Sequence, residues 1–249
     1  MLYAALTFWL LVAVFTAWGV HHIWSGLVKP RTVNLLLLPG TLVAQIGYVM
    51  GVLVSGGTVN NTTVIKDDDT AEPQQDDNPK PRIPVIGPVL IGMLPLGACG
   101  LALYVASRSL GANITGRLGH DLLAVSLPVT MGQFWDLLRS LITLAQQAFE
   151  AVWTAELLQI PTAIFVYLVV CLTVRMAPFP GNLRGSIGAI VLLGVVAAVL
   201  GTALPAAVDM VHGWWPVLSL AVATLLALLL LSLAVRGLVE LVRVLATQG

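Results

Sequence analysis

Residues 214–235 read WWPVLSLAVATLLALLLLSLAV, and this stretch decides the fold. It contains no charged side chain, and a transmembrane helix needs about 20 predominantly apolar residues. In the hydrocarbon of a bilayer the backbone N–H and C=O groups have no water to bond, so a long apolar segment that crosses it is helical. The stretch therefore predicts a transmembrane helix.

The composition of the whole chain agrees with this prediction. The 249 residues are 58% hydrophobic and only 10% charged, and the mean hydropathy is +0.93. Soluble domains carry about 25% charged residues, so an ordinary water-soluble globule is excluded. Disorder is excluded as well, because so many apolar side chains would be left in water. The net charge is zero and no long basic tract is present, which argues against a nucleic-acid partner.

Five further apolar segments resemble residues 214–235 in length. They cover residues 2–20, 33–54, 83–106, 157–174 and 185–207. Pro39-Gly40 interrupts the second segment, which neighbouring helices can accommodate. No Lys or Arg precedes the first segment, so we interpret it as a retained helix and not as a secretory signal. We expect an all-α polytopic membrane helix bundle with about six transmembrane helices, in which residues 1–249 form a single integral membrane domain.

A polar loop, residues 55–82, separates the second and third predicted spans. It holds six of the twelve acidic residues and is rich in Asn, Gln and Pro. Gly56-Gly57 and the β-branched residues that follow predict a short β-hairpin at its start. The acidic run at residues 67–69 has two interpretations: a divalent-cation site, or simply a solvated loop, which we favour.

The basic residues give a weak signal for orientation. With six spans, seven basic residues lie on the side of the acidic loop and five on the other side. Because cytoplasmic loops carry an excess of Lys and Arg, we expect this loop in the cytoplasm. The location that we expect for the protein is the bacterial inner membrane.

Residues 131–158 form a different kind of segment. Polar side chains from Gln133 to Thr154 recur mostly at steps of three or four, so they form one stripe on a helix. The segment predicts an amphipathic helix. It either lies in the membrane interface or spans the bilayer with its stripe toward a polar interior.

His21 and His22 close the first predicted span between two tryptophans, Trp18 and Trp24. Aromatic side chains gather at the level of the lipid headgroups, so we interpret this cluster as an interface anchor. A metal or haem ligand is the alternative, but adjacent histidines on a helix point about 100° apart and do not form one site by themselves.

Residues 38–65 read LPGTLVAQIGYVMGVLVSGGTVNNTTVI. A helix that begins near Pro39-Gly40, ends at Gly56-Gly57 and leads into a strand-like stretch resembles the zinc-binding core of the site-2 protease (M50) family of intramembrane metalloproteases. In that family the helix carries His-Glu-x-x-His. Two histidines four residues apart reach one zinc ion from the same helix face, and the glutamate acts as general base on the zinc-bound water.

The residues that would carry this chemistry are replaced in the present chain. Ala44 stands at the place of the first histidine, Gln45 at that of the glutamate and Tyr48 at that of the second histidine. We call these three the motif positions. The family takes a third zinc ligand, an aspartate, from a later helix, and Asn182 stands at the place that the resemblance assigns to it. An alanine has no ligand atom, and a glutamine amide does not accept a proton at neutral pH.

The resemblance therefore implies a non-catalytic multi-pass membrane protein, an inactive pseudoprotease of the site-2 type with no metal and no cofactor. Its expected partners are the lipid bilayer and another membrane protein. One alternative is a structural or accessory subunit of a larger membrane complex, because the small residues of the segment 185–207 suit close helix packing. A further alternative is a small transporter, which the break at Pro39 favours.

Overall fold

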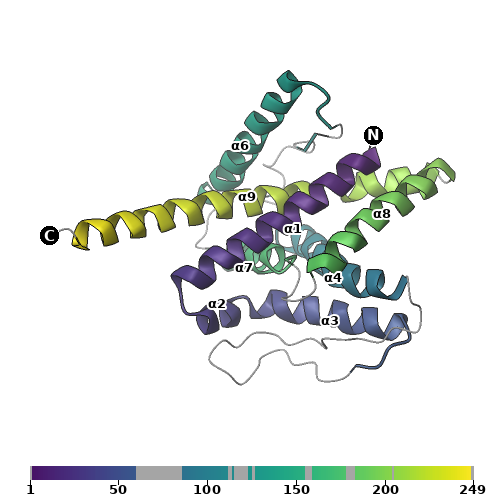
Figure 1. Ribbon diagram of the computed structural model, residues 1–249, viewed down its shortest axis with the longest axis horizontal. Coiled ribbons are helices and arrows are strands. Elements are labelled where there is room, and N and C mark those ends of the chain that lie inside the picture. Colours follow the sequence, from purple (N-terminus) through teal and green to yellow (C-terminus); the bar gives the residue numbers. More distant parts are fainter. Residues whose placement is uncertain are drawn as a thin grey trace.

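The computed structural model describes residues 2–59, 86–111, 114, 123–124, 127–154, 159–177, 183–203 and 205–247, and this part of the chain is helical with connecting turns (Figure 1). The expected all-α class is confirmed at this level. The helices are α1 (Leu2–Leu27), α2 (Pro30–Leu36), α3 (Leu38–Val54), α4 (Ile86–Ser109), α6 (Met131–Trp153), α7 (Ile160–Val174), α8 (Leu183–Ala203) and α9 (Pro205–Thr247).

Three helical segments are long and apolar enough to cross a membrane. They are Leu2–Leu27, Gly87–Ser109 and Val211–Leu245. Helices α2 and α3 form a fourth candidate if the pair, bent by 75°, counts as one broken span. The expected number of six is not confirmed: α7 has 15 residues, fewer than the roughly 20 that a perpendicular span needs, and α8 is not among the three candidates found in the described residues.

Several helix ends differ from the predicted ones. Helix α1 continues to Leu27 instead of ending at residue 20, and α9 runs over 43 residues, far beyond 214–235. The predicted ends were placed where hydropathy falls, but backbone hydrogen bonding continues through polar residues such as His21 and Arg236. The predicted β-hairpin lies almost wholly outside the described residues, and Thr58 and Val59 follow the turn at Gly56 without forming a strand.

Helices α1 and α9 lie side by side and run in the same direction (Figure 1). Near one end of the pair the indole N–H of Trp24 donates to Ser232 Oγ at 2.7 Å. Toward the other end the indoles of Trp9 and Trp215 donate to backbone carbonyls of the adjacent residues Ala124 and Leu123, at 2.9 and 3.2 Å. These three hydrogen bonds fix the position of α1 along the axis of α9.

Helices α3 and α4 form a tightly packed antiparallel pair. A Cβ atom on Gly47 would lie 2.6 Å from the carbonyl oxygen of Leu94, and one on Gly51 would lie 2.9 Å from Cα of Ile91. Glycines four residues apart let membrane helices approach to backbone contact. The sequence GYVMG at residues 47–51 is thus the contact surface of this pair.

Helix α6 leaves the body of the protein at an angle and rests on α9 (Figure 1). Thr130 and Gln133 form a capping box at its start. Leu137, Leu144 and Ala148 are buried, whereas the predicted polar stripe is largely exposed. The amphipathic helix is therefore confirmed, although it ends at Trp153 and not at residue 158.

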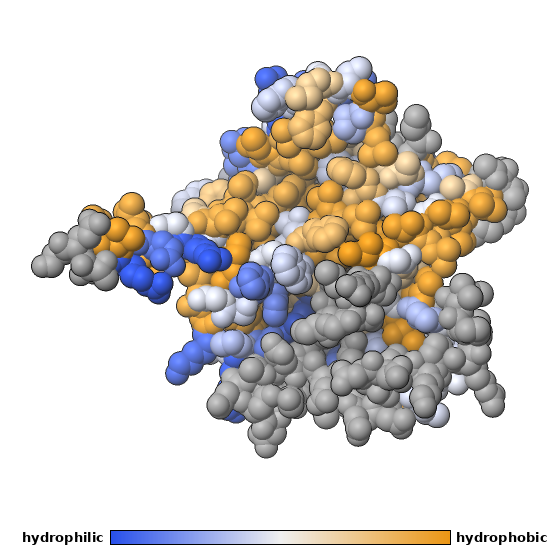
Figure 2. Space-filling model, viewed as in Figure 1, coloured by the Kyte–Doolittle hydropathy of each residue, from blue (hydrophilic) through white to orange (hydrophobic). Residues whose placement is uncertain are grey.

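Hydrophobic residues also cover much of the described outer surface over α1 and α8, while hydrophilic ones gather on the C-terminal part of α9 (Figure 2). Exposed large hydrophobic side chains occur on α3, α4, α8 and α9. A surface of this kind is stable in lipid and not in water.

Candidate functional site

The three motif positions all lie inside the protein. Ala44 is 0% exposed, Tyr48 2% and Gln45 3%. Ala44 packs in an apolar cluster with residues of α4 and α7, among them Cys99 and Phe165. Tyr48 belongs to a second cluster with Val52 of α3 and Ile91 of α4. The helix face that would carry a zinc site therefore faces the interior, as such a site requires.

The residues on this face do not fit a zinc ion. Ala44 offers only a methyl group, and the one residue of its hydrophobic cluster that could bind zinc from α4 is Cys99. Zinc takes nitrogen, sulfur or carboxylate ligands, three or four of them from the protein. Within the described part of the chain no three His, Cys, Asp or Glu residues are placed to share a metal ion.

The fourth predicted site residue, Asn182, lies outside the described residues, which resume at Leu183 with α8. Helix α3 packs chiefly against α4 and α7, whereas α8 packs against α1 and α4. The structure thus brings Ala44, Gln45 and Tyr48 together on one buried face, and Asn182 is not placed relative to them.

Sequence reasoning missed a buried polar cluster at the junction of α2 and α3. Nη2 of Arg175, the residue after α7, donates to Oδ1 of Asn34 on α2 at 2.7 Å. Nε2 of His21 on α1 lies 3.4 Å from the same oxygen. Asn34 is 5% exposed and Arg175 6%. Three separate segments of the chain therefore meet at one amide oxygen.

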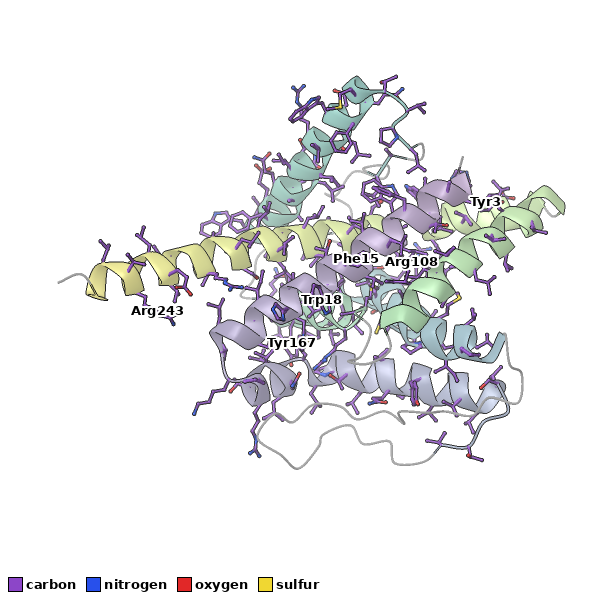
Figure 3. All side chains as sticks on the ribbon, viewed as in Figure 1. Tyr3, Phe15, Trp18, Arg108, Tyr167 and Arg243 are labelled. Atoms are coloured by element: carbon purple, nitrogen blue, oxygen red, sulfur yellow. The ribbon has the colours of Figure 1, made fainter. Side chains whose placement is uncertain are left out.

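The break between α2 and α3 is covered by side chains of α7. The hydroxyl of Tyr167 donates to the carbonyl oxygen of Leu36 at 2.8 Å (Figure 3), and Sγ of Cys171 lies 3.4 Å from that oxygen. The last carbonyls of a helix need partners from outside it, and α7 supplies them here. A Cβ atom on Gly40 would collide with the carbonyl group of Cys171, so only glycine permits this approach.

This arrangement holds a sharp bend in place. Burying a guanidinium group costs free energy unless it is hydrogen-bonded. The burial of Arg175 therefore depends on its hydrogen bond to Asn34. The signals that could have revealed the cluster are a polar Asn34 within an apolar segment and an arginine directly after a short apolar helix. His21, a predicted interface anchor, contacts Asn34 at this junction.

Comparisons of the chain with family models, curated proteins and solved structures returned no match. The class of protein therefore rests on the structure itself. The length and composition of α1, α4 and α9 indicate an integral membrane protein with an all-helical described fold.

Proposed function

We propose that this chain is a non-catalytic membrane protein that retains the helix arrangement of a site-2-type protease and acts by binding another membrane protein. The observation that carries the non-catalytic part is the packing of the motif positions. Ala44, Gln45 and Tyr48 are buried against α4 and α7. An active centre needs a metal and a water molecule at such a place, and none of these three side chains is the histidine, cysteine or carboxylate that would hold the metal.

The surface that we assign to the partner is the C-terminal extension of α9, residues 233–245. Every side chain from Leu233 to Leu245 is exposed, and the segment projects from the body of the protein (Figure 1). Arg236, Glu240 and Arg243 form one narrow stripe at steps of four and three, and leucine and valine dominate the remaining faces.

The length of α9 explains why this extension needs a partner. The apolar segment Val211–Leu245 has 35 residues, which corresponds to about 52 Å of helix, whereas the hydrocarbon core is about 30 Å thick. A large part of the helix therefore leaves the hydrocarbon. Leu238 and Leu241, 63% and 58% exposed, would then face water unless another protein covers them.

Extraction in polymer nanodiscs tests this proposal. We expect the wild-type chain to leave the membrane in an assembly larger than its own 26.3 kDa plus the nanodisc. The double variant Leu238→Glu/Leu241→Glu should leave it as a single chain, while the control Glu240→Gln on the polar stripe should keep the assembly. A wild-type chain that is solitary in these particles would contradict partner binding.

Metal analysis tests the non-catalytic part separately. We expect the purified protein, after exposure to zinc and removal of loosely bound ions, to carry far less than one zinc per chain. One tightly bound zinc per chain would overturn the pseudoprotease proposal and leave the proposed partner surface unaffected.

A structural or accessory subunit remains the second candidate, because the same exposed extension of α9 would serve a permanent complex equally well. The two differ in stoichiometry: an accessory subunit is extracted in a constant ratio to its partner, and a transient binding protein is not. We also propose the bacterial inner membrane as its location, with the acidic loop in the cytoplasm.

A further inference from the structure

A half-open cavity of about 560 Å³ lies between α1, α4, α8 and α9. It is much larger than another cavity among the described residues, of about 190 Å³, between α6, α7 and α9. Apart from Tyr3, its lining consists of leucine, valine, alanine, glycine, methionine and tryptophan side chains. None of them carries a charge.

Glycines on α4 keep this cavity open. Gly97 and Gly100 line it, and a Cβ atom on either would meet no atom within 4 Å. Their situation is opposite to that of Gly47 and Gly51, which are needed because another backbone is in contact with them. Glycine weakens a helix relative to alanine, so the open space at both positions calls for an explanation other than helix packing.

The position of the cavity determines what can fill it. Three of its four walls, α1, α4 and α9, are the three candidate membrane spans. A cavity lined almost wholly by apolar side chains is a poor site for water, and at this depth the surrounding solvent is the hydrocarbon of the bilayer. A lipid acyl chain is therefore the occupant that matches both the lining and the surroundings.

One face of α4 leads from the cavity to a positive charge. Gly97, Leu101, Tyr104 and Arg108 follow one another at steps of four, three and four, so they share a helix face. The Tyr104 ring lies 5.3 Å from that of Trp214, a lining residue. The guanidinium carbon of Arg108 lies 5.7 Å from the centre of the Tyr104 ring.

Arg108 stands at the end of the candidate span Gly87–Ser109 and is exposed (Figure 3). It lies about 10 Å along the helix from Leu101, at 1.5 Å per residue. Arginine binds phosphate through two parallel N–H···O bonds, and the end of a span is where lipid phosphates lie. The distance between Arg108 and the cavity therefore suits a phospholipid whose phosphate lies on Arg108 and whose acyl chain lies in the cavity.

Tyr3 lines the cavity from α1. Its hydroxyl oxygen is shielded from solvent and makes no hydrogen bond. Tyr3 lies about two turns before Trp9 on α1. Trp9 and Trp215 lie at the same level of the α1–α9 pair, because their indoles donate to the carbonyls of the adjacent residues Ala124 and Leu123. Tyr3 therefore belongs to the same end of the α1–α9 pair as Trp214. Because the hydroxyl oxygen is shielded, it is the rest of the Tyr3 side chain that meets the acyl chain in the cavity.

We propose that this cavity binds one acyl chain of an anionic membrane phospholipid, with the lipid phosphate on Arg108. The site lies between α1, α4, α8 and α9, apart from the motif positions on α3 and from the extension of α9. Its failure would therefore leave the proposed function untouched.

Native mass spectrometry of the protein released from nanodiscs tests the site. The probe is a bilayer of phosphatidylglycerol and phosphatidylcholine in equal amounts. We expect one phospholipid retained per wild-type chain. Both lipids offer a phosphate to Arg108, but the choline group of phosphatidylcholine adds a positive charge near the guanidinium, so phosphatidylglycerol should be enriched about tenfold. Arg108→Gln should retain a lipid but lose the enrichment.

Two variants fill the cavity from different walls. Gly100→Leu on α4 and Ala197→Phe on α8 should both abolish lipid retention while the circular dichroism spectrum stays helical. Gly237→Leu is the matched control, because a Cβ atom at Gly237 also meets nothing within 4 Å but lies on the extension of α9. It should retain the lipid.

Three results would overturn the proposal. The first is a wild-type chain that retains no phospholipid. The second is a folded Gly100→Leu or Ala197→Phe variant that still retains the lipid. The third is retention of phosphatidylcholine equal to that of phosphatidylglycerol, which would contradict the preference for an anionic lipid.

Discussion

Arg175 reaches across 141 residues of sequence to donate a 2.7 Å hydrogen bond to Asn34, and both side chains are buried. The bond joins the end of α7 to α2, one turn before the chain bends by 75° into α3. Since α3 carries the motif positions, this pair of residues determines how that helix is presented to α4 and α7.

The first prediction concerns this pair. Asn34→Ala removes the acceptor of a buried charged donor, so the free energy of unfolding should fall by about 2 kcal/mol. Asn34→Asp keeps an acceptor and should restore most of the loss. Tryptophan fluorescence during unfolding of the detergent-solubilised protein measures both. Ser25→Ala, near the surface of α1, is the control, and an equal loss in that variant would contradict the prediction.

The second prediction contrasts two glycines of the α3–α4 pair. Gly47→Ala places a methyl group 2.6 Å from the carbonyl oxygen of Leu94 and should destabilise the protein by about 1–3 kcal/mol. Gly97→Ala enters open space on α4 and should be neutral or stabilise the protein by up to about 1 kcal/mol. Thermal unfolding in one detergent compares them directly. Equal effects would show that the two helices do not meet at Gly47.

The third prediction concerns the register of α1 and α9. Trp24→Phe and Ser232→Ala each remove one partner of the 2.7 Å bond between these helices. A double-mutant cycle should give a coupling of about 0.6 kcal/mol, the size typical of hydrogen bonds between membrane helices. Trp18→Phe combined with Ser232→Ala is the control cycle, and we expect no coupling there.

The fourth prediction decides between the two placements of α6. Ile142 is 57% exposed and the adjacent Thr143 is exposed on the polar side. If α6 lies in the interface, Thr143→Cys should react quickly with a membrane-impermeant maleimide in vesicles, and Ile142→Cys should be protected by lipid. The native Cys99 and Cys171 are buried and should contribute little background. Equal reactivity at the two positions would contradict an interfacial helix.

Much of the fold follows from local patterns. The all-α class, the cores of the three long apolar helices, the break near Pro39 and the amphipathic helix after Thr130 could all be predicted. Each depends on residues close together in sequence: hydropathy over about 20 residues, one proline, or a polar stripe at helical spacing. The α3 face with Ala44 and Tyr48 is buried, and the resemblance to the site-2 proteases stays a prediction.

The positions of the helix ends and the number of spans were harder to predict. Hydropathy falls at His21 and at Arg236, yet α1 and α9 continue past these residues. Helix propensity and backbone hydrogen bonds decide where a helix stops, and hydropathy alone does not report them. The polar cluster at Asn34 was missed for a related reason, since its members are far apart in the chain.

The sequence by itself determined that this chain belongs in a bilayer, that its described elements are helices, and that the motif positions hold no zinc ligands, because these properties are local to each residue or each segment. Only the tertiary structure decided that Arg175 meets Asn34, that Gly47 touches α4 while Gly97 faces open space, and that four helices enclose an apolar cavity. Those relationships depend on which helix faces lie opposite one another. Hydropathy does not determine this, because an apolar helix face is as stable against lipid as against another apolar face, and only close packing selects its partner.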